Sequence, residues 1–131
     1  MVGIVVVSHS NKLAEEVIKI SMQMCQSNEL KIAAAGGTFD NRFGTDANRI
    51  MEAITEVDTG DGVVILVDLG SAIMSAELAI EFLGDVVAKN VHIADAPIVE
   101  GSIAAVSQAS IGATLQEVIT AAEDAKNYPK K

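Results

Sequence analysis

Cysteine is almost absent from this chain of 131 residues, which contains only Cys25. A single thiol cannot form an internal disulfide, and this fits a reducing compartment. The sequence also lacks any apolar run close to the ~20 residues that a bilayer-spanning helix needs. Its opening residues, MVGIVVVSHS, have no basic segment before the apolar run, which is typical of a β-strand rather than of a signal peptide. These absences predict a cytoplasmic protein without a membrane segment.

Aromatic and basic residues are also scarce. The chain has three phenylalanines, one tyrosine and no tryptophan. This composition argues against a base-stacking surface and against a flavin held between aromatic rings. Nine basic residues are spread along the chain against 18 acidic ones, which gives a formal net charge of −9. Nucleic-acid binding needs a concentrated positive surface, so no nucleic-acid partner is expected.

Short apolar runs alternate with longer amphipathic stretches along the chain. The runs predict strands at residues 2–7, 30–35, 63–67 and 91–94. The amphipathic stretches predict helices at residues 12–26, 47–57, 72–83, 102–108 and 114–125. Alternating strands and helices with short connections predict an α/β domain with a mainly parallel four-stranded sheet, for which we expect the order 2-1-3-4. One domain is expected over residues 1–125, followed by a frayed tail at 126–131.

Two of the predicted helices carry more specific expectations. Ser10 or Asn11 is placed to cap the helix at 12–26, whose apolar residues recur at helical spacing as Leu13, Val17, Ile20 and Met24. The helix at 72–83 is apolar almost all round, with only Glu77 and Glu81 as charges. Such a helix usually packs against more than its own sheet, so we expect it at a subunit interface.

Polar segments follow the first three predicted strands. They are Ser-His-Ser-Asn at 8–11, Gly-Gly-Thr at 36–38 and Asp-Leu-Gly-Ser at 68–71. In open α/β sheets, ligands bind beyond the carboxyl ends of the strands, where the strand order reverses. With the order 2-1-3-4, the first and third strands flank that point. His9 and Asp68 are therefore expected to face each other.

This pair of residues suits the transfer of a phosphoryl group through histidine. A neutral imidazole is a good nucleophile near pH 7, and the phosphoramidate that it forms can pass the group onward. Asp68 can accept a hydrogen bond from one ring nitrogen of His9 and so fix the tautomer. The start of the helix after Asp68 offers free N–H groups to an anion. The residues expected around the phosphoryl group are Ser10, Gly37, Thr38, Gly70 and Ser71.

Each of these signals has an ordinary structural explanation when taken alone. A histidine at a strand end is commonly structural, Gly-Gly-Thr is a common turn, and an aspartate near a serine begins many helices. Their convergence at one edge of the sheet favours a functional site. His92 lies in the apolar segment Val-His-Ile without polar companions, so we expect it to be packed or exposed at an edge. Two histidines and one distant cysteine have no metal-ligand spacing, and no metal site is expected.

Several motifs in order and at matching spacing carry a family resemblance. VVVSHS and LAE near the start, AGGT and FGT further on, VDLGSA with MSAE, and DAPIVEGSIAA together resemble the EIIA domain of the mannose-type phosphotransferase system. The similarity extends from Val2 to about Ala122. Sugar-transporting relatives tend to carry a tryptophan and Gly-Gly-Ser-Pro after the third strand. Asp-Leu-Gly-Ser-Ala at 68–72 instead resembles the branch that serves bacterial dihydroxyacetone kinase.

The resemblance implies a phosphotransferase subunit that works through a phosphohistidine. His9 would accept a phosphoryl group on Nε2 from phospho-HPr, which enzyme I charges from phosphoenolpyruvate, and Asp68 would orient the ring. The group would pass to ADP on the DhaL subunit, while DhaK binds dihydroxyacetone. ADP and magnesium would belong to the partner, so no cofactor is expected on this chain. Because no HPr-like or enzyme-I-like domain follows, we expect a separate donor. Family members are homodimers, which fits the apolar helix at 72–83.

Two alternatives remain open at this point. A sugar-specific EIIA domain would pass the phosphoryl group to an EIIB domain, and the partner that discharges the phosphoprotein would distinguish this function from the first. A flavodoxin-like nucleotide-binding module would need aromatic stacking and a hydroxyl-rich phosphate loop after the first strand. Ser-His-Ser at 8–10 is a poor version of such a loop.

Overall fold

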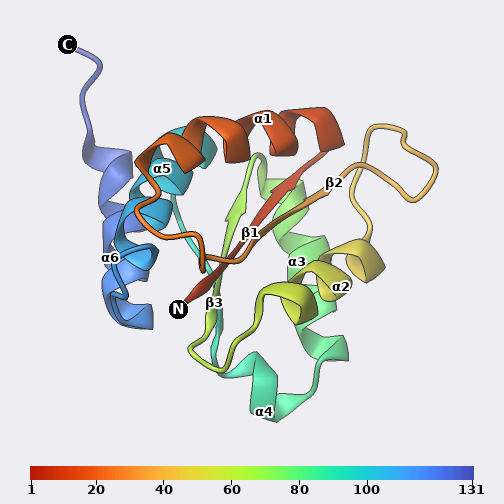
Figure 1. The fold of residues 1–131 in the computed structure, drawn as a ribbon. Coiled ribbons are helices and arrows are strands. Elements are labelled where there is room, and N and C mark those ends of the chain that lie inside the picture. Colours follow the sequence, from red (N-terminus) through yellow and green to blue (C-terminus); the bar gives the residue numbers. More distant parts are fainter.

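Four short apolar strands form a parallel sheet at the centre of the computed structural model, which describes residues 1–131 (Figure 1). They are β1 (Gly3–Ser8), β2 (Ile32–Gly36), β3 (Val63–Val67) and β4 (Val91–Ile93). Their order is β2-β1-β3-β4, which confirms the predicted topology. The central strands β1 and β3 are buried along their whole length because helices cover both faces of the sheet. This explains why both strands are continuous apolar runs.

Six α-helices and two short 3₁₀ turns complete the fold. The helices are α1 (Asn11–Ser21), α2 (Ala47–Val57), α3 (Gly70–Phe82), α4 (Asp85–Ala88), α5 (Ile98–Ala109) and α6 (Leu115–Asp124). The 3₁₀ turns are η1 (Met22–Met24) and η2 (Ala125–Asn127). None of the helices has the length and apolar character required to cross a bilayer.

Alternate residues of β1 serve two separate halves of the core. Ile4 and Val6 pack with residues of α1, α5 and α6 on one face of the sheet. Val5 and Val7 pack with residues of α2 and α3 on the other face. The sheet is therefore a middle layer between two helical layers (Figure 1). Its carboxyl edge is left for the loops that follow the strands.

The apolar residues at helical spacing in α1 and η1 are mostly exposed. Val17 is buried, but Leu13, Ile20 and Met24 are 43%, 50% and 48% exposed. The small residues Ala14 and Ser21 are fully buried in their place. Ser21 satisfies its hydroxyl by donating a hydrogen bond to the Val17 carbonyl at 2.8 Å. Small side chains let the helix lie close to its neighbours, and spacing alone does not reveal this.

Other helix boundaries also differ from those predicted. The helix expected at 12–26 ends at Ser21 and continues as η1. α5 begins at Ile98, directly after Pro97, four residues earlier than expected. The four-residue helix α4 was not predicted, because one turn is too short to show a helical period. The helix at 47–57 and the strand at 63–67 match their predicted bounds.

His92 has a polar partner that the sequence did not predict. Its Nε2 lies 3.3 Å from the Glu123 carboxylate of α6, which also accepts a hydrogen bond from the Asp95 N–H at 2.8 Å. This partner lies 31 residues further along the chain, so the neighbouring sequence does not reveal it. The expected exposure at an edge is confirmed, because β4 is an edge strand and the His92 side chain is 43% exposed. Near the C-terminus, Lys126 of η2 pairs with Asp95 at 2.9 Å, and Lys130 contacts Glu100. The frayed tail at 126–131 stays a prediction.

Candidate active site

The candidate site lies where β1 and β3 end side by side. Val7 and Val67 are paired in the parallel register, so the next residues of the two strands emerge at the same edge. Ser8 remains buried in the sheet, while His9 and Asp68 begin the loops. The topology therefore brings together the two residues that were predicted to face each other. The switch point of the sheet lies between β1 and β3, where the order reverses.

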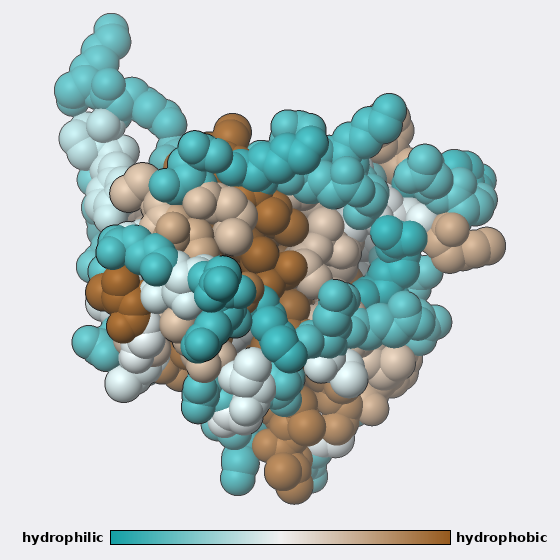
Figure 2. Space-filling view, viewed as in Figure 1, coloured by the Kyte–Doolittle hydropathy of each residue, from teal (hydrophilic) through white to brown (hydrophobic).

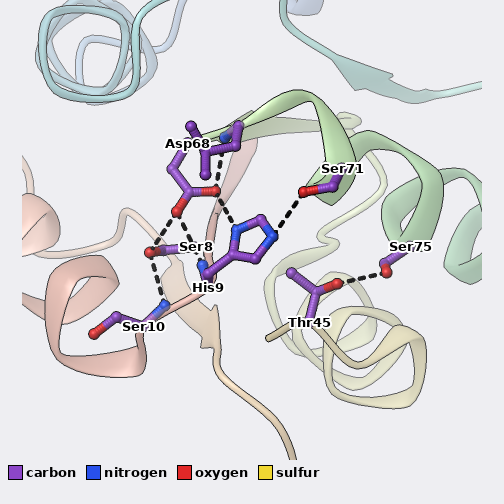
Figure 3. A network of polar contacts seen from close by, with 8 residues as sticks. Ser8, His9, Ser10, Thr45, Asp68, Ser71 and Ser75 are labelled. Atoms are coloured by element: carbon purple, nitrogen blue, oxygen red, sulfur yellow. Dashed lines mark hydrogen bonds and ion pairs between the residues drawn. The ribbon is translucent and has the colours of Figure 1, made fainter. Parts of the chain in front are cut away.

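His9 is held by Asp68 through its ring and its backbone (Figure 3). Nδ1 lies 3.0 Å from Asp68 Oδ1, and the His9 N–H donates to Asp68 Oδ2 at 2.9 Å. A carboxylate can only accept hydrogen bonds, so Nδ1 carries the ring proton in the neutral imidazole. Nε2 is then left with its lone pair. The His9 side chain is 28% exposed, so the ring can be approached from solvent.

The Ser71 hydroxyl lies 2.8 Å from Nε2 of His9. With the proton of the ring on Nδ1, the hydroxyl is the donor and Nε2 the acceptor. Ser71 stands in the first turn of α3, next to Gly70. A Cβ at Gly70 would meet nothing within 4 Å, so the start of this helix is sterically open. Ser71 is thus in direct contact with the ring nitrogen that carries the lone pair.

The Asp68 carboxylate accepts hydrogen bonds from four groups. In addition to the two from His9, the Ser8 hydroxyl donates at 2.9 Å and the Leu69 N–H at 2.7 Å. Partial burial by itself would raise the pKa of Asp68, but the hydrogen bonds from His9 and Ser8 outweigh it. The net effect holds the pKa of Asp68 below its ordinary value. The carboxylate therefore stays charged at neutral pH and continues to accept the hydrogen bond from the imidazole.

Ser8 is a part of the site to which the sequence assigned no role. Its side chain is fully buried, donates to Asp68 and accepts a hydrogen bond from the Ser10 N–H at 3.0 Å. It therefore connects the carboxylate to the start of α1. Ser10 in turn caps α1 by accepting from the Leu13 N–H at 3.3 Å, which confirms the predicted cap. The only sequence signal for Ser8 is a hydroxyl at the buried end of an apolar strand.

Two glycines allow β2 to end close to the site. A Cβ at Gly36 would lie 2.5 Å from the Asn11 Cα, so any larger residue would push β2 away from the start of α1. Gly37 has a φ of 70°, which favours glycine, and its N–H donates to the Ser8 carbonyl at 3.1 Å. Further along the same loop, the Gly44 N–H donates to the His9 carbonyl at 2.9 Å. The loop between β2 and α2 is therefore fixed at both ends to the end of β1.

The Thr38 hydroxyl is used within this loop. It donates to Asp40 and accepts from the Arg42 N–H at 3.1 Å, and it makes no hydrogen bond to His9. A second hydroxyl pair was not predicted from the sequence. Thr45, at the base of the loop, lies 2.6 Å from the Ser75 hydroxyl, one turn after Ser71 in α3 (Figure 3). This pair joins the loop to the helix that carries Ser71.

No group of three or more histidine, cysteine, aspartate or glutamate side chains gathers in a way that could hold a metal ion. The polar groups that do gather at the carboxyl edge of the sheet are hydroxyls, backbone N–H groups and one carboxylate around a single imidazole. This arrangement can activate a nitrogen nucleophile and donate hydrogen bonds to a group bound to it.

The fold and the site define an α/β protein with a carboxylate-oriented histidine at the switch point of a parallel sheet. The sequence profile of the EIIA-man family, described as the PTS system fructose IIA component, matches residues 3–119. The chain belongs to this family, which confirms the resemblance seen in its motifs.

Known relatives narrow the resemblance within the family. The chain is 46% identical over 121 residues to the Escherichia coli K12 protein named "PEP-dependent dihydroxyacetone kinase, phosphoryl donor subunit DhaM". That match covers 91% of this chain and 26% of the relative, so the chain spans about a quarter of that protein's length. A DhaM of dihydroxyacetone kinase 2 from Listeria innocua is 35% identical over 119 residues, with 91% of this chain and 94% of the relative covered.

A solved structure has the same fold over the whole chain. The crystal structure of a protein of unknown function superposes with a TM-score of 0.83 at 33% sequence identity. The match covers 100% of this chain and 98% of that chain. It supports the four-stranded parallel architecture.

Proposed function

We propose that this chain is a phosphoryl carrier of a dihydroxyacetone kinase system, in which His9 receives a phosphoryl group from a donor protein and passes it to a nucleotide on an acceptor subunit. The observation that carries the proposal is the His9 ring itself. Nδ1 is bound by Asp68 at 3.0 Å, so Nε2 is the nitrogen that carries the lone pair, which accepts a hydrogen bond from Ser71 at 2.8 Å. The relatives named as phosphoryl donor subunits of that kinase support the substrate system.

In the proposed first step, Nε2 of His9 attacks the phosphorus of phospho-HPr. The new P–Nε2 bond forms as the donor's P–N bond breaks, and that bond's electron pair returns to the donor imidazole. Positive charge develops on the His9 ring, and the Asp68 carboxylate stabilises it through Nδ1–H. The Ser71 hydroxyl, 2.8 Å from Nε2, is placed to donate to a phosphoryl oxygen instead once the bond has formed.

In the proposed second step, an oxygen of the terminal phosphate of ADP attacks the phosphoryl group. A P–O bond forms, the P–Nε2 bond breaks, and its electrons return to Nε2. The nucleotide and its magnesium are held by the DhaL subunit, and the ATP formed there serves the phosphorylation of dihydroxyacetone on DhaK. This chain thus needs no cofactor of its own and would work in the cytoplasm.

We further propose that the working form is a homodimer formed through α3. Three alanines, Ala72, Ala76 and Ala79, face the core. The opposite side of the helix exposes large apolar residues: Met74 at 75%, Leu78 at 44% and Phe82 at 52%. Apolar surface also gathers over α4 at the lower end of the molecule (Figure 2). Light scattering should give twice the chain mass, and Met74→Glu should shift it to the mass of one chain.

Phosphorylation of the purified chain tests the proposed function. Incubation with labelled phosphoenolpyruvate, enzyme I and HPr should give an acid-labile, base-stable phosphoprotein. His9→Ala should remain unlabelled, and His92→Gln, which removes the only other histidine, should label like the wild type. Labelling of His9→Ala would contradict the proposal. The label should then be discharged by DhaL with bound ADP, whereas loss to an EIIB domain alone would assign the chain to the sugar branch.

A further inference from the structure

The loop between β2 and α2 presents two aromatic side chains to solvent. Phe39 and Phe43 are 80% and 85% exposed, although the whole chain has only four aromatic residues. The loop, residues 38–44, projects from the carboxyl edge of the sheet (Figure 1). In Figure 2, apolar residues lie beside hydrophilic residues at this outer edge of the molecule. Exposed aromatic side chains that protrude in this way are typical of sites that contact another protein.

The 38–44 loop is ordered by its own hydrogen bonds. The Thr38 N–H donates to the Arg42 carbonyl and the Asn41 N–H to the Thr38 carbonyl, both at 3.0 Å. Asn41 adopts the left-handed conformation with a φ of 62°, and Arg42 Nε lies 2.7 Å from Asp40 Oδ2. A loop fixed in this way loses little conformational entropy when a partner binds. The aromatic side chains are therefore presented on a preformed support.

The distance from this loop to His9 is short on the scale of a protein interface. A typical interface covers roughly 800 Å² on each partner, which corresponds to a disc about 16 Å in radius. Phe43 precedes Gly44, whose N–H is 2.9 Å from the His9 carbonyl oxygen. Phe39 follows Thr38, which is hydrogen-bonded to Arg42 next to Phe43. A folded protein that brings a reacting group to Nε2 of His9 must therefore also meet this loop.

The charge beside the loop indicates which partner this is. Lys12 and Arg42 line a hollow of about 180 Å³ with Asn11 and Asn41, next to the start of α1. Arg42 is already paired with Asp40 at 2.7 Å, so Lys12 carries the positive charge of this hollow that no carboxylate pairs with, in a chain with a net charge of −9. A phosphohistidine donor brings only the negative charge of the group that it hands over. A nucleoside diphosphate acceptor brings two further phosphates that stay on the partner, and Lys12 adds positive charge to that of the magnesium held there.

We infer that the 38–44 loop is the docking element for the nucleotide-bearing acceptor protein. Phe39 and Phe43 enter an apolar hollow on that protein, and Lys12 faces its bound diphosphate. The inference rests on the proposed function of His9 as a phosphoryl carrier. It adds the surface that binds the acceptor protein and the kind of bound nucleotide that this surface recognises.

The test measures two reactions separately: the phosphorylation of this chain by phospho-HPr (the charging arm) and the transfer from the phosphorylated chain to DhaL–ADP (the discharge arm). In the discharge arm, phosphorylated wild type and the Phe39→Ser/Phe43→Ser variant are mixed with increasing concentrations of DhaL–ADP. The variant should need an acceptor concentration higher by about tenfold or more for half-maximal rate, because aromatic anchors dominate interfaces. Its rate at saturating acceptor should remain within about twofold of the wild type, because His9 and Asp68 are unchanged.

The charging arm separates failure of this inference from failure of the proposed function. Ile111→Ser, which removes a side chain 60% exposed near the opposite end of β1, is the matched control and should behave like the wild type in both arms. If His9 of the wild type is never labelled, the proposed function itself fails. If labelling is normal but the double variant discharges like the wild type, the docking role is wrong. If charging by phospho-HPr is impaired as much as discharge or more, the assignment to the acceptor is wrong.

Discussion

The substitution Asp68→Asn removes one charge from the site and keeps the size of the side chain. The carboxylate accepts four hydrogen bonds of 2.7–3.0 Å. An asparagine amide has an NH₂ group at one of the two oxygen positions. At the Oδ1 position it would face the Leu69 N–H, and at the Oδ2 position it would face the His9 N–H. Either orientation leaves at least one backbone donor without an acceptor.

The size of the effect can be worked out from these contacts. The His9 N–H is part-buried and the Leu69 N–H is exposed, so leaving one of them unsatisfied should lower the free energy of unfolding by no more than about 1–3 kcal/mol, the cost of a fully buried donor. A hydrogen bond to a charged group is worth about 1.5–3 kcal/mol, and in either orientation of the amide His9 Nδ1 loses its charged acceptor. Each 1.36 kcal/mol in the barrier is tenfold in rate. The proposed phosphorylation of His9 should therefore slow by about 10- to 160-fold.

The assay is single-turnover phosphorylation of His9 by excess phospho-HPr, stopped at short times. Asp95→Asn is the matched control, because it removes the same charge from a side chain that is 83% exposed and pairs with Lys126. The control should react like the wild type. If Asp68→Asn stays folded and reacts within about threefold of the wild type, then the carboxylate does not orient the ring and the argument from its contacts fails.

Other predictions concern single contacts of the same region. Ser71→Ala removes the hydroxyl 2.8 Å from Nε2 of His9 and should slow the phosphorylation of His9 by phospho-HPr by about 2- to 12-fold. An unchanged rate would contradict a role for this hydroxyl. The lowered pKa of Asp68 means that its ionised form stabilises the folded chain above about pH 3.8 and that this contribution is lost at lower pH. Urea unfolding should therefore show the stability gap between wild type and Asp68→Asn narrowing below that pH, and a constant gap would refute the sign. Gly36→Ala should lower the free energy of unfolding by about 1–3 kcal/mol, because its Cβ would lie 2.5 Å from a neighbouring backbone atom. Gly70→Ala, whose Cβ would meet nothing within 4 Å, should raise it by up to about 1 kcal/mol because alanine is the better helix residue. Equal free energies from urea unfolding would show that the close approach at Gly36 does not limit the substitution.

The approach of His9 and Asp68 was predictable because it depends only on the backbone. Two continuous apolar runs predict buried parallel strands, and the carboxyl ends of such strands meet at one edge. The pairing of Val7 with Val67 then places the following residues side by side, whatever their side chains. The phosphotransfer role assigned to the pair is not fixed in this way and remains a proposal.

The contacts that surround the pair depend on packing and were not predictable. Leu13, Ile20 and Met24 recur at helical spacing, but the helix turns its small residues inward because it lies close to its neighbours. Ser8 acquires its role only when the end of β3 is placed next to it. Thr38 was expected near the phosphoryl group, yet its hydroxyl closes the turn of its own loop. A sequence pattern does not show which of several partners a hydroxyl will choose.

The contact between Ser71 and His9 has a consequence for the energy balance of the proposed relay. In the resting protein the hydroxyl donates to the nitrogen that must react, and in the loaded protein it can donate to the phosphoryl oxygen instead. One hydrogen bond is exchanged for another, so this hydroxyl favours neither state by much. A strong preference for the loaded state would trap the phosphoryl group, and a strong preference for the empty state would prevent loading. In the proposed relay, Ser71 would thus favour neither acceptance nor release of the phosphoryl group.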